Sequence, residues 1–126
     1  MESIVLGKTH RTPGVNFDAN TGILELSGRS IPENALAFYQ PLLDWIDEYQ
    51  QAADHKIINA IFRLEYFNTS SSKCLLDLLR KLETVHQEGI QVNVQWYYDT
   101  RDEDMEEAGK DFQDLIETDF ELIPLP

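Results

Sequence analysis

The sequence predicts a single α/β domain with a mixed β-sheet whose helices pack mainly on one face. Apolar and polar residues alternate strictly in residues 56–67 and again in residues 90–98. Alternation with a period of two gives each strand one buried face and one largely solvated face. A leucine-rich helical pattern separates the two segments. Because strand–helix–strand units form right-handed parallel crossovers, these two strands are expected to be parallel.

The length and the cysteine content fit one domain over residues 1–126. A chain of 126 residues can bury a core without disulfides or structural metal ions. Cys74 is the only cysteine, which excludes an intramolecular disulfide and fits a reducing compartment. The first residues, "MESIVLGKTH", lack a basic flank followed by a long apolar run. We therefore expect no signal peptide, no membrane-spanning segment and a cytoplasmic location.

The net charge of -13 restricts the possible partners. Nucleic acids and anionic membranes are bound by clustered Lys and Arg, so we expect neither as a partner. A high negative charge commonly serves solubility alone. A basic protein partner is the more specific interpretation, and the charge by itself does not separate the two.

The first third of the chain predicts a hairpin followed by a helix. Two short apolar runs, residues 14–18 and 22–28, flank turn residues. Ser30 and Glu33 then have the spacing of a capping box, and we expect a helix from that point. Pro41 lies inside the helical pattern and is expected to kink or break the helix near Phe38 to Pro41. The expected buried face is Ala35, Tyr39, Leu42, Ile46 and Tyr49.

The remaining elements alternate between strands and helices. The first alternating strand is expected to bury Ile58, Ala60, Phe62, Leu64 and Tyr66, and the second Ile90, Val92, Val94, Trp96 and Tyr98. The helix between them spans about residues 70–88, ends at Gly89 and buries Leu75, Leu78, Leu79, Leu82 and Val85. A last helix with an acidic start is expected to pack through Met105, Phe112, Leu115 and Ile116. The segment "FELIPLP" predicts a short final strand that Pro124 and Pro126 stop.

The sequence contains no pattern that assembles a catalytic or metal site. His10, His55 and His86 are scattered, and none has a second ligand three or four residues away. There is no nucleophile elbow, phosphate loop or dinucleotide-binding glycine motif. The acidic run at residues 102–107 is interpreted as a solvated face, and Cys74 as a small core residue. We therefore expect no enzyme activity, no cofactor and no metal.

A run of hydroxyl residues precedes the leucine-rich helix: Thr69, Ser70, Ser71 and Ser72. One of the first two is expected to cap the helix, which accounts for only part of the run. Acidic chains are expected to place Asp or Glu in a first helical turn, but here the first carboxylate is Asp77 and Lys73 precedes it. Backbone N–H groups, the helix dipole and a lysine together form an anion site. Phosphorylation of one of these hydroxyl groups would add a charge of about -1.5 to -2 to this anion site.

The candidate site therefore contains a phosphorylated hydroxyl and the residues around it. We expect Asn68, Ser70, Ser71, Ser72 and Lys73 to contact a partner or an anion. Lys73 lies one helical turn after Thr69, so their side chains can share a face. A small-ligand or anion-binding module remains an alternative function.

Two segments resemble a known family. "SGRSIPENALAFYQPLLDWI" and "LEYFNTSSSKCLLDLL" are similar to signature segments of the SiaC family of bacterial regulatory phosphoproteins, and the resemblance spans about residues 12–123. The family is similar in fold to STAS domains, the anti-sigma-factor antagonists. In STAS domains, a partner kinase phosphorylates a Ser or Thr at the start of the helix after a central strand, and a PPM-type phosphatase restores it.

The resemblance implies a function for the candidate site. The unphosphorylated protein would bind and activate a diguanylate cyclase. Phosphorylation by a cognate Ser/Thr kinase would release it, so cyclic-di-GMP synthesis and biofilm formation would fall. The family's phosphoacceptor threonine maps onto Thr69, whereas STAS spacing counted from Phe67 selects Ser71, and Ser70 is the third candidate. A STAS-like ligand-binding module and an unrecognised enzyme are the competing classes.

Overall fold

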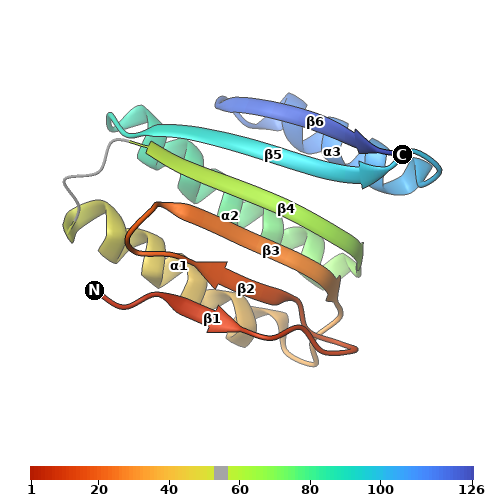
Figure 1. Cartoon of the computed structure of the whole chain (residues 1–126), viewed down its shortest axis with the longest axis horizontal. Coiled ribbons are helices and arrows are strands. Elements are labelled where there is room, and N and C mark those ends of the chain that lie inside the picture. Colours follow the sequence, from red (N-terminus) through yellow and green to blue (C-terminus); the bar gives the residue numbers. More distant parts are fainter. Residues whose placement is uncertain (53–56) are drawn as a thin grey trace.

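The computed structural model describes residues 1–52 and 57–126, which form one sheet and the helices that cover it (Figure 1). The strands are β1 (Ile4–Leu6), β2 (Gly14–Phe17), β3 (Ile23–Ser30), β4 (Ile57–Phe67), β5 (Gln91–Asp99) and β6 (Asp119–Leu125). The helices are α1 (Ala35–Ala52), α2 (Thr69–Gln87) and α3 (Glu103–Leu115).

The sheet is mixed, and its strands lie in chain order β1-β2-β3-β4-β5-β6. The β1–β2 and β2–β3 pairs are antiparallel, and the three later pairs are parallel. The helices connect the parallel strands and lie behind the sheet in Figure 1, which leaves the other face open. This confirms the predicted mixed α/β architecture with helices on one face. β1 was missed because its three residues are too few for a periodic signal.

The core lies between the sheet and the helices. The predicted inward positions of β4 and β5 are confirmed for Ile58, Ala60, Phe62, Leu64, Val92, Val94 and Trp96, which are all buried. The leucine stripe of α2 is buried as predicted, and so is the predicted face of α1. Trp45 also belongs to that face of α1 and stacks on Tyr49, with a centroid distance of 5.0 Å.

The predicted capping box at the start of α1 is wrong. Ser30 is the last residue of β3, is fully buried and pairs with Phe67 of β4. The helix begins at Ala35, and the Asn34 side chain accepts a hydrogen bond from the backbone N–H of Ala37 at 3.1 Å. Asn is as good an N-cap as Ser, and the later position leaves room for the chain to cross from the sheet to the helix layer.

Of the predicted kink or break near Pro41, the break does not occur, because α1 runs from Ala35 to Ala52 with Pro41 inside it. Pro41 is exposed, so the carbonyl that loses its N–H partner lies on the solvated side of the helix. Tyr39, Trp45 and Tyr49 are buried on the other side and hold the helix on both sides of the proline.

A β-bulge near the end of β4 overturns the prediction for Tyr66. Gly28 of β3 pairs with Leu64 of β4, and the next residue, Arg29, pairs with Tyr66. Glu65 is therefore an extra residue in β4 that has no partner in β3. Tyr66 is therefore 48% exposed, and the Arg29 guanidinium lies 5.6 Å from its ring centroid. The same shift turns Phe67 towards the core.

Two expectations at the C-terminal end are corrected. Leu115 is 48% exposed, whereas Met105, Phe112 and Ile116 are buried as predicted. The buried side of α3 follows positions 105, 109, 112 and 116, which leaves Leu115, its last residue, beside that face. Pro124 does not stop β6 but pairs with Tyr98, because an edge strand tolerates a residue without an N–H.

Three buried hydroxyl groups join β3 to α1 and α2. The Ser30 hydroxyl donates to Ser71 Oγ at 2.8 Å and lies 2.7 Å from the Tyr39 hydroxyl, so Tyr39 is the donor of that second bond. Ser30 and Ser71 are 0% exposed and Tyr39 is 1% exposed. Burial raises the pKa of Tyr39 to about 12, so this phenol keeps its proton at physiological pH.

The Tyr39 hydroxyl is expected to make stability depend on alkaline pH. Its pKa is about 12 in the folded protein against an ordinary value of 10.0, so its contribution is present below pH 10 and is lost as the pH rises towards 12. Tyr39→Phe should cost about 1 kcal/mol near neutral pH through the lost hydrogen bond. Urea titrations of both proteins at pH 8 and pH 11 measure this. A difference in unfolding free energy that stays constant between the two pH values would contradict it.

Gly109 allows α3 to approach the sheet closely, and we expect it to tolerate no side chain. A Cβ atom there would lie 2.5 Å from Trp96 Cδ1 and 2.6 Å from Leu122 Cδ2. Gly109→Ala should therefore destabilise the protein by about 1–3 kcal/mol, despite the higher helix propensity of Ala. Gly7→Ala is the matched control, because a Cβ at Gly7 meets nothing within 4 Å. Thermal melts in which both variants match wild type would show that the α3 contact is loose.

Candidate functional site

The candidate site is the junction between β4 and α2, at the edge of the sheet where the parallel strands end. Asn68 is extended and is the N-cap of α2, because its Oδ1 accepts a hydrogen bond from the Ser71 N–H at 2.9 Å. The prediction that Thr69 or Ser70 caps the helix is therefore wrong. All four hydroxyl residues lie inside the first turn, where none of them is needed as the cap.

The helix separates these hydroxyl residues by their exposure. Thr69 and Ser70 are exposed, Ser72 is half-buried and Ser71 is completely buried. Ser71 faces inward because the buried residues of α2 continue at Cys74 and Leu75, three and four positions later. Its Oγ accepts from Ser30, so it belongs to the buried hydrogen-bond chain.

The start of α2 is electropositive. Its first turn contains no acidic residue. Asn68 uses its side chain and its carbonyl to accept from the N–H groups of Ser71 and Ser72. Within residues 1–52 and 57–126, no hydrogen bond engages the N–H groups of Thr69 and Ser70. These groups and the helix dipole favour an anion at this point.

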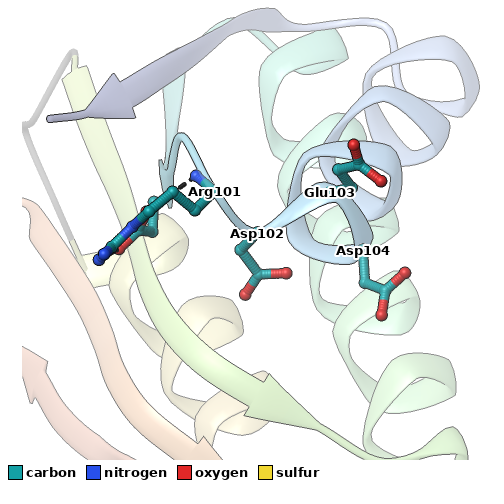
Figure 2. A pocket seen from close by; sticks show the side chains of 5 residues that line it. Arg101, Asp102, Glu103 and Asp104 are labelled. Atoms are coloured by element: carbon teal, nitrogen blue, oxygen red, sulfur yellow. Dashed lines mark hydrogen bonds and ion pairs between the residues drawn. The ribbon is translucent and has the colours of Figure 1, made fainter.

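The start of α3 lies at the same edge and is built in the opposite way (Figure 2). Asp102 caps the helix by accepting from the Met105 N–H at 3.0 Å, and acidic residues follow in the first turn. Arg101 binds Asp99 through two side-chain hydrogen bonds of 2.9 and 3.1 Å, which are the main reason why the pKa of Asp99 falls to about 2. The start of α3 therefore supplies its own negative charge.

An open depression of about 600 Å³ lies beside this acidic loop and is lined by Asp99, Arg101, Asp102, Glu103 and Asp104. Glu103 points away from Asp102 and Asp104 (Figure 2). In the part of the chain that the structure describes, no group of three or more His, Cys, Asp or Glu side chains is placed to hold a metal ion. His86 is structural, since its Nδ1 lies 3.2 Å from both the Ile90 carbonyl oxygen and the Val92 nitrogen. His55 lies outside the described residues.

The predicted site residues are brought together at the start of α2, with Ser71 withdrawn into the core. Lys73 is exposed, and Cys74 is buried as expected. Burial and the neighbouring Asp77 raise the pKa of the Cys74 thiol, so it is not activated as a nucleophile.

Two loops from earlier in the chain lie beside the site, and the sequence did not predict them there. The Asn68 N–H donates to the Ser30 carbonyl oxygen at 3.2 Å. The N–H of Ile31, the residue after β3, donates to the Arg11 carbonyl oxygen at 2.8 Å. The segment that follows β3 therefore adjoins the start of α2, and the loop that contains Arg11 lies next to that segment, one spacing further away. Contacts over such sequence separations leave no local pattern that could have been found.

Among the helices that the structure describes, none is both long enough and apolar enough to cross a membrane.

Comparison with known proteins agrees with this architecture over nearly the whole chain. The sequence profile of the SiaC family regulatory phosphoproteins matches residues 6–125. An uncharacterized protein of Pseudomonas aeruginosa is 33% identical over 114 residues, which cover 90% of each chain.

Solved structures agree as well. SiaC of Pseudomonas aeruginosa superposes with a TM-score of 0.92 at 30% identity, covering 99% of this chain and 100% of that chain. The crystal structure of diguanylate cyclase SiaD in complex with its activator SiaC, also from Pseudomonas aeruginosa, contains a chain that superposes with a TM-score of 0.89. That chain is 32% identical, with coverages of 97% and 99%. The protein described here belongs to the SiaC family of regulatory phosphoproteins.

Proposed function

We propose that this protein is a non-enzymatic, cytoplasmic phosphoswitch that controls a diguanylate cyclase. The unphosphorylated form binds and activates the cyclase. A cognate Ser/Thr kinase phosphorylates Thr69 and releases the protein, and a PPM-type phosphatase restores it. The switch thereby sets cyclic-di-GMP synthesis and biofilm formation.

The observation that carries the proposal is the different exposure of the hydroxyl groups at an acid-free helix start. Thr69 is the first residue of α2 and is exposed, next to two N–H groups with no partner in the described part of the chain. Ser71 is buried and hydrogen-bonded, so a kinase would reach its hydroxyl only after the core opened. Ser70 is exposed as well and is the second candidate.

A phosphate on Thr69 would act through charge and position. It would add about -1.5 to -2 charge where the helix dipole and the two N–H groups favour an anion. The modification therefore opposes no existing interaction of the fold. Its effect would fall on the surface around Thr69, where a partner that contacts the helix start would meet a dianion.

The cyclase is proposed as the partner because a relative of similar structure binds one. SiaC of Pseudomonas aeruginosa is the activator in the SiaD complex, and this chain superposes on a chain of that complex with a TM-score of 0.89. The STAS-like placement of the acceptor, after a central strand and at a helix start, supports the kinase and the phosphatase as the other partners.

The same two N–H groups favour a second candidate, a module that binds a small anion at the start of α2. Incubation with the cognate kinase and ATP, followed by intact-mass measurement, separates the candidates. A phosphoswitch gains one covalent phosphate, whereas an anion-binding module keeps its mass and shows saturable nucleotide or phosphate binding by calorimetry.

Phosphotransfer is expected to occur at Thr69. Tandem mass spectrometry of the kinase-treated protein should locate a single phosphate on this residue, because its hydroxyl is exposed and the Ser71 hydroxyl is not. Thr69→Val, which keeps the shape and removes the hydroxyl, should abolish labelling. Ser70→Ala is the matched control and should be labelled like wild type. Phosphate on Ser71, or persistent labelling of Thr69→Val, would falsify the assignment.

Charge at position 69 is expected to gate the contact with the cyclase. Thr69→Asp should weaken binding by at least about tenfold, because a buried or repelled carboxylate at an interface costs more than about 1.4 kcal/mol. The Asn side chain of Thr69→Asn has nearly the same shape as that of Asp but no charge, so this variant should bind like wild type. Titration calorimetry and cyclase activity assays measure both. Equal affinities of the two folded variants would show that Thr69 does not gate this contact.

A further inference from the structure

The basic residues of this acidic chain fall into two groups. The chain has ten Lys and Arg against 23 Asp and Glu, and Lys56 lies outside the described residues. Five of the others form ion pairs: Arg63, Arg80, Lys81, Arg101 and Lys110. Within the described residues, four form none: Lys8, Arg11, Arg29 and Lys73. An excess of carboxylates should leave few cations unpaired, so the position of these four is informative.

All four lie at the edge of the sheet where α2 begins. Arg29 is the last residue but one of β3, and Lys73 opens the second turn of α2. Lys8 and Arg11 lie in the loop that joins β1 to β2.

Backbone hydrogen bonds fix how near that loop is to the site. The peptide group between Ser30 and Ile31 makes a hydrogen bond on each side. Its N–H donates to the Arg11 carbonyl oxygen at 2.8 Å, and its carbonyl oxygen accepts from the Asn68 N–H at 3.2 Å. The Arg11 backbone is therefore about two strand spacings, roughly 10 Å, from Asn68. The Arg11 side chain is exposed.

Contacts with uncharged groups hold two of these cations in place. The Arg29 guanidinium donates to the His10 carbonyl oxygen at 3.3 Å and lies over the ring of Tyr66. The Lys8 side chain packs on Gly28, where an added Cβ would lie 3.1 Å from Lys8 Cδ. The Arg29 guanidinium and the aliphatic part of the Lys8 side chain are thus held in place without a carboxylate partner. This lowers the conformational entropy lost when a carboxylate binds.

We propose that Lys8, Arg11, Arg29, Tyr66 and Lys73, the basic corner, bind a carboxylate-rich segment of the protein partner. This inference rests on the proposed phosphoswitch and supplies its physical basis. The Thr69 phosphate, with about -1.5 to -2 charge, offsets about half of the four positive charges and competes with the partner's carboxylates.

Charge complementarity selects this occupant. With a net charge of -13, most of the surface repels an acidic segment, so the attractive contact is confined to the basic corner. Exposed Tyr and Arg side chains are also the residue types most often found at the energetic centre of an interface. The net charge is compatible with a basic partner or with solubility alone, whereas the local arrangement of cations at the site favours an acidic segment.

A test without the partner uses a hexaglutamate peptide at low salt. In an amide NMR titration, shift changes should be confined to residues 8–13, 29–31 and 66–73. Arg11→Gln should weaken the binding about twofold to fivefold. The variant should stay folded, because no contact within the described residues depends on the Arg11 side chain. Arg101→Gln, which removes an already paired cation at the same edge, should change affinity little. No binding, or shifts spread over the surface, would overturn the basic corner.

A test with the cyclase separates this inference from the proposed function. Arg11→Gln and Lys73→Gln should each weaken binding of the unphosphorylated protein about twofold to fivefold and flatten its salt dependence, with Arg101→Gln close to wild type. If Arg11→Gln and Lys73→Gln bind the cyclase like wild type while Thr69→Asp binds it more weakly, the basic corner is overturned and the phosphoswitch is still supported. If the arginine and lysine variants bind the cyclase more weakly while Thr69→Asp binds it like wild type, the basic corner is supported and gating by phosphate is refuted.

Discussion

The buried hydrogen bonds from Tyr39 to Ser30 and from Ser30 to Ser71 fix the geometry on which the site depends. A buried hydroxyl without a partner costs about 1–3 kcal/mol, so the end of β3 and the two helices must meet at one point. This sets the rotation of α2 about its own axis. With Ser71 facing inward, helical geometry turns Thr69 outward. The core therefore determines which hydroxyl groups of the run are exposed and which one is buried.

The bulge at Glu65 has a comparable effect on the other side of the junction. Without the extra residue, Tyr66 would continue the buried face of β4 and Phe67 would be solvated. With it, the Phe67 ring lies 6.2 Å from that of Trp96, and Tyr66 supports Arg29 outside the core. One inserted residue thus anchors the end of β4 and also exposes an aromatic ring beside the candidate site.

Much of the fold could be predicted because periodicity is a local property. The alternation in β4 and β5 and the leucine stripe of α2 each need only their own segment, and they define the mixed sheet covered on one face. The capping residue could not be chosen the same way, since Asn68 and Thr69 are both good caps and the burial of Ser71 decides between them. The neighbours of the site, such as Arg11, depend on pairing between distant segments and leave no trace in the local sequence.

The contrast between the starts of α2 and α3 indicates which helix start could accept an added negative charge. The first turn of α3 contains Glu103, Asp104 and Glu106, so an added phosphate there would meet like charges. The first turn of α2 contains no acid, and its exposed Thr69 adjoins the basic corner. A phosphate dianion at Thr69 would therefore gain from the helix dipole while it changed the charge of the surrounding surface. The proposed switch would act by altering what the surface attracts, with the packed sheet and helices as its fixed support.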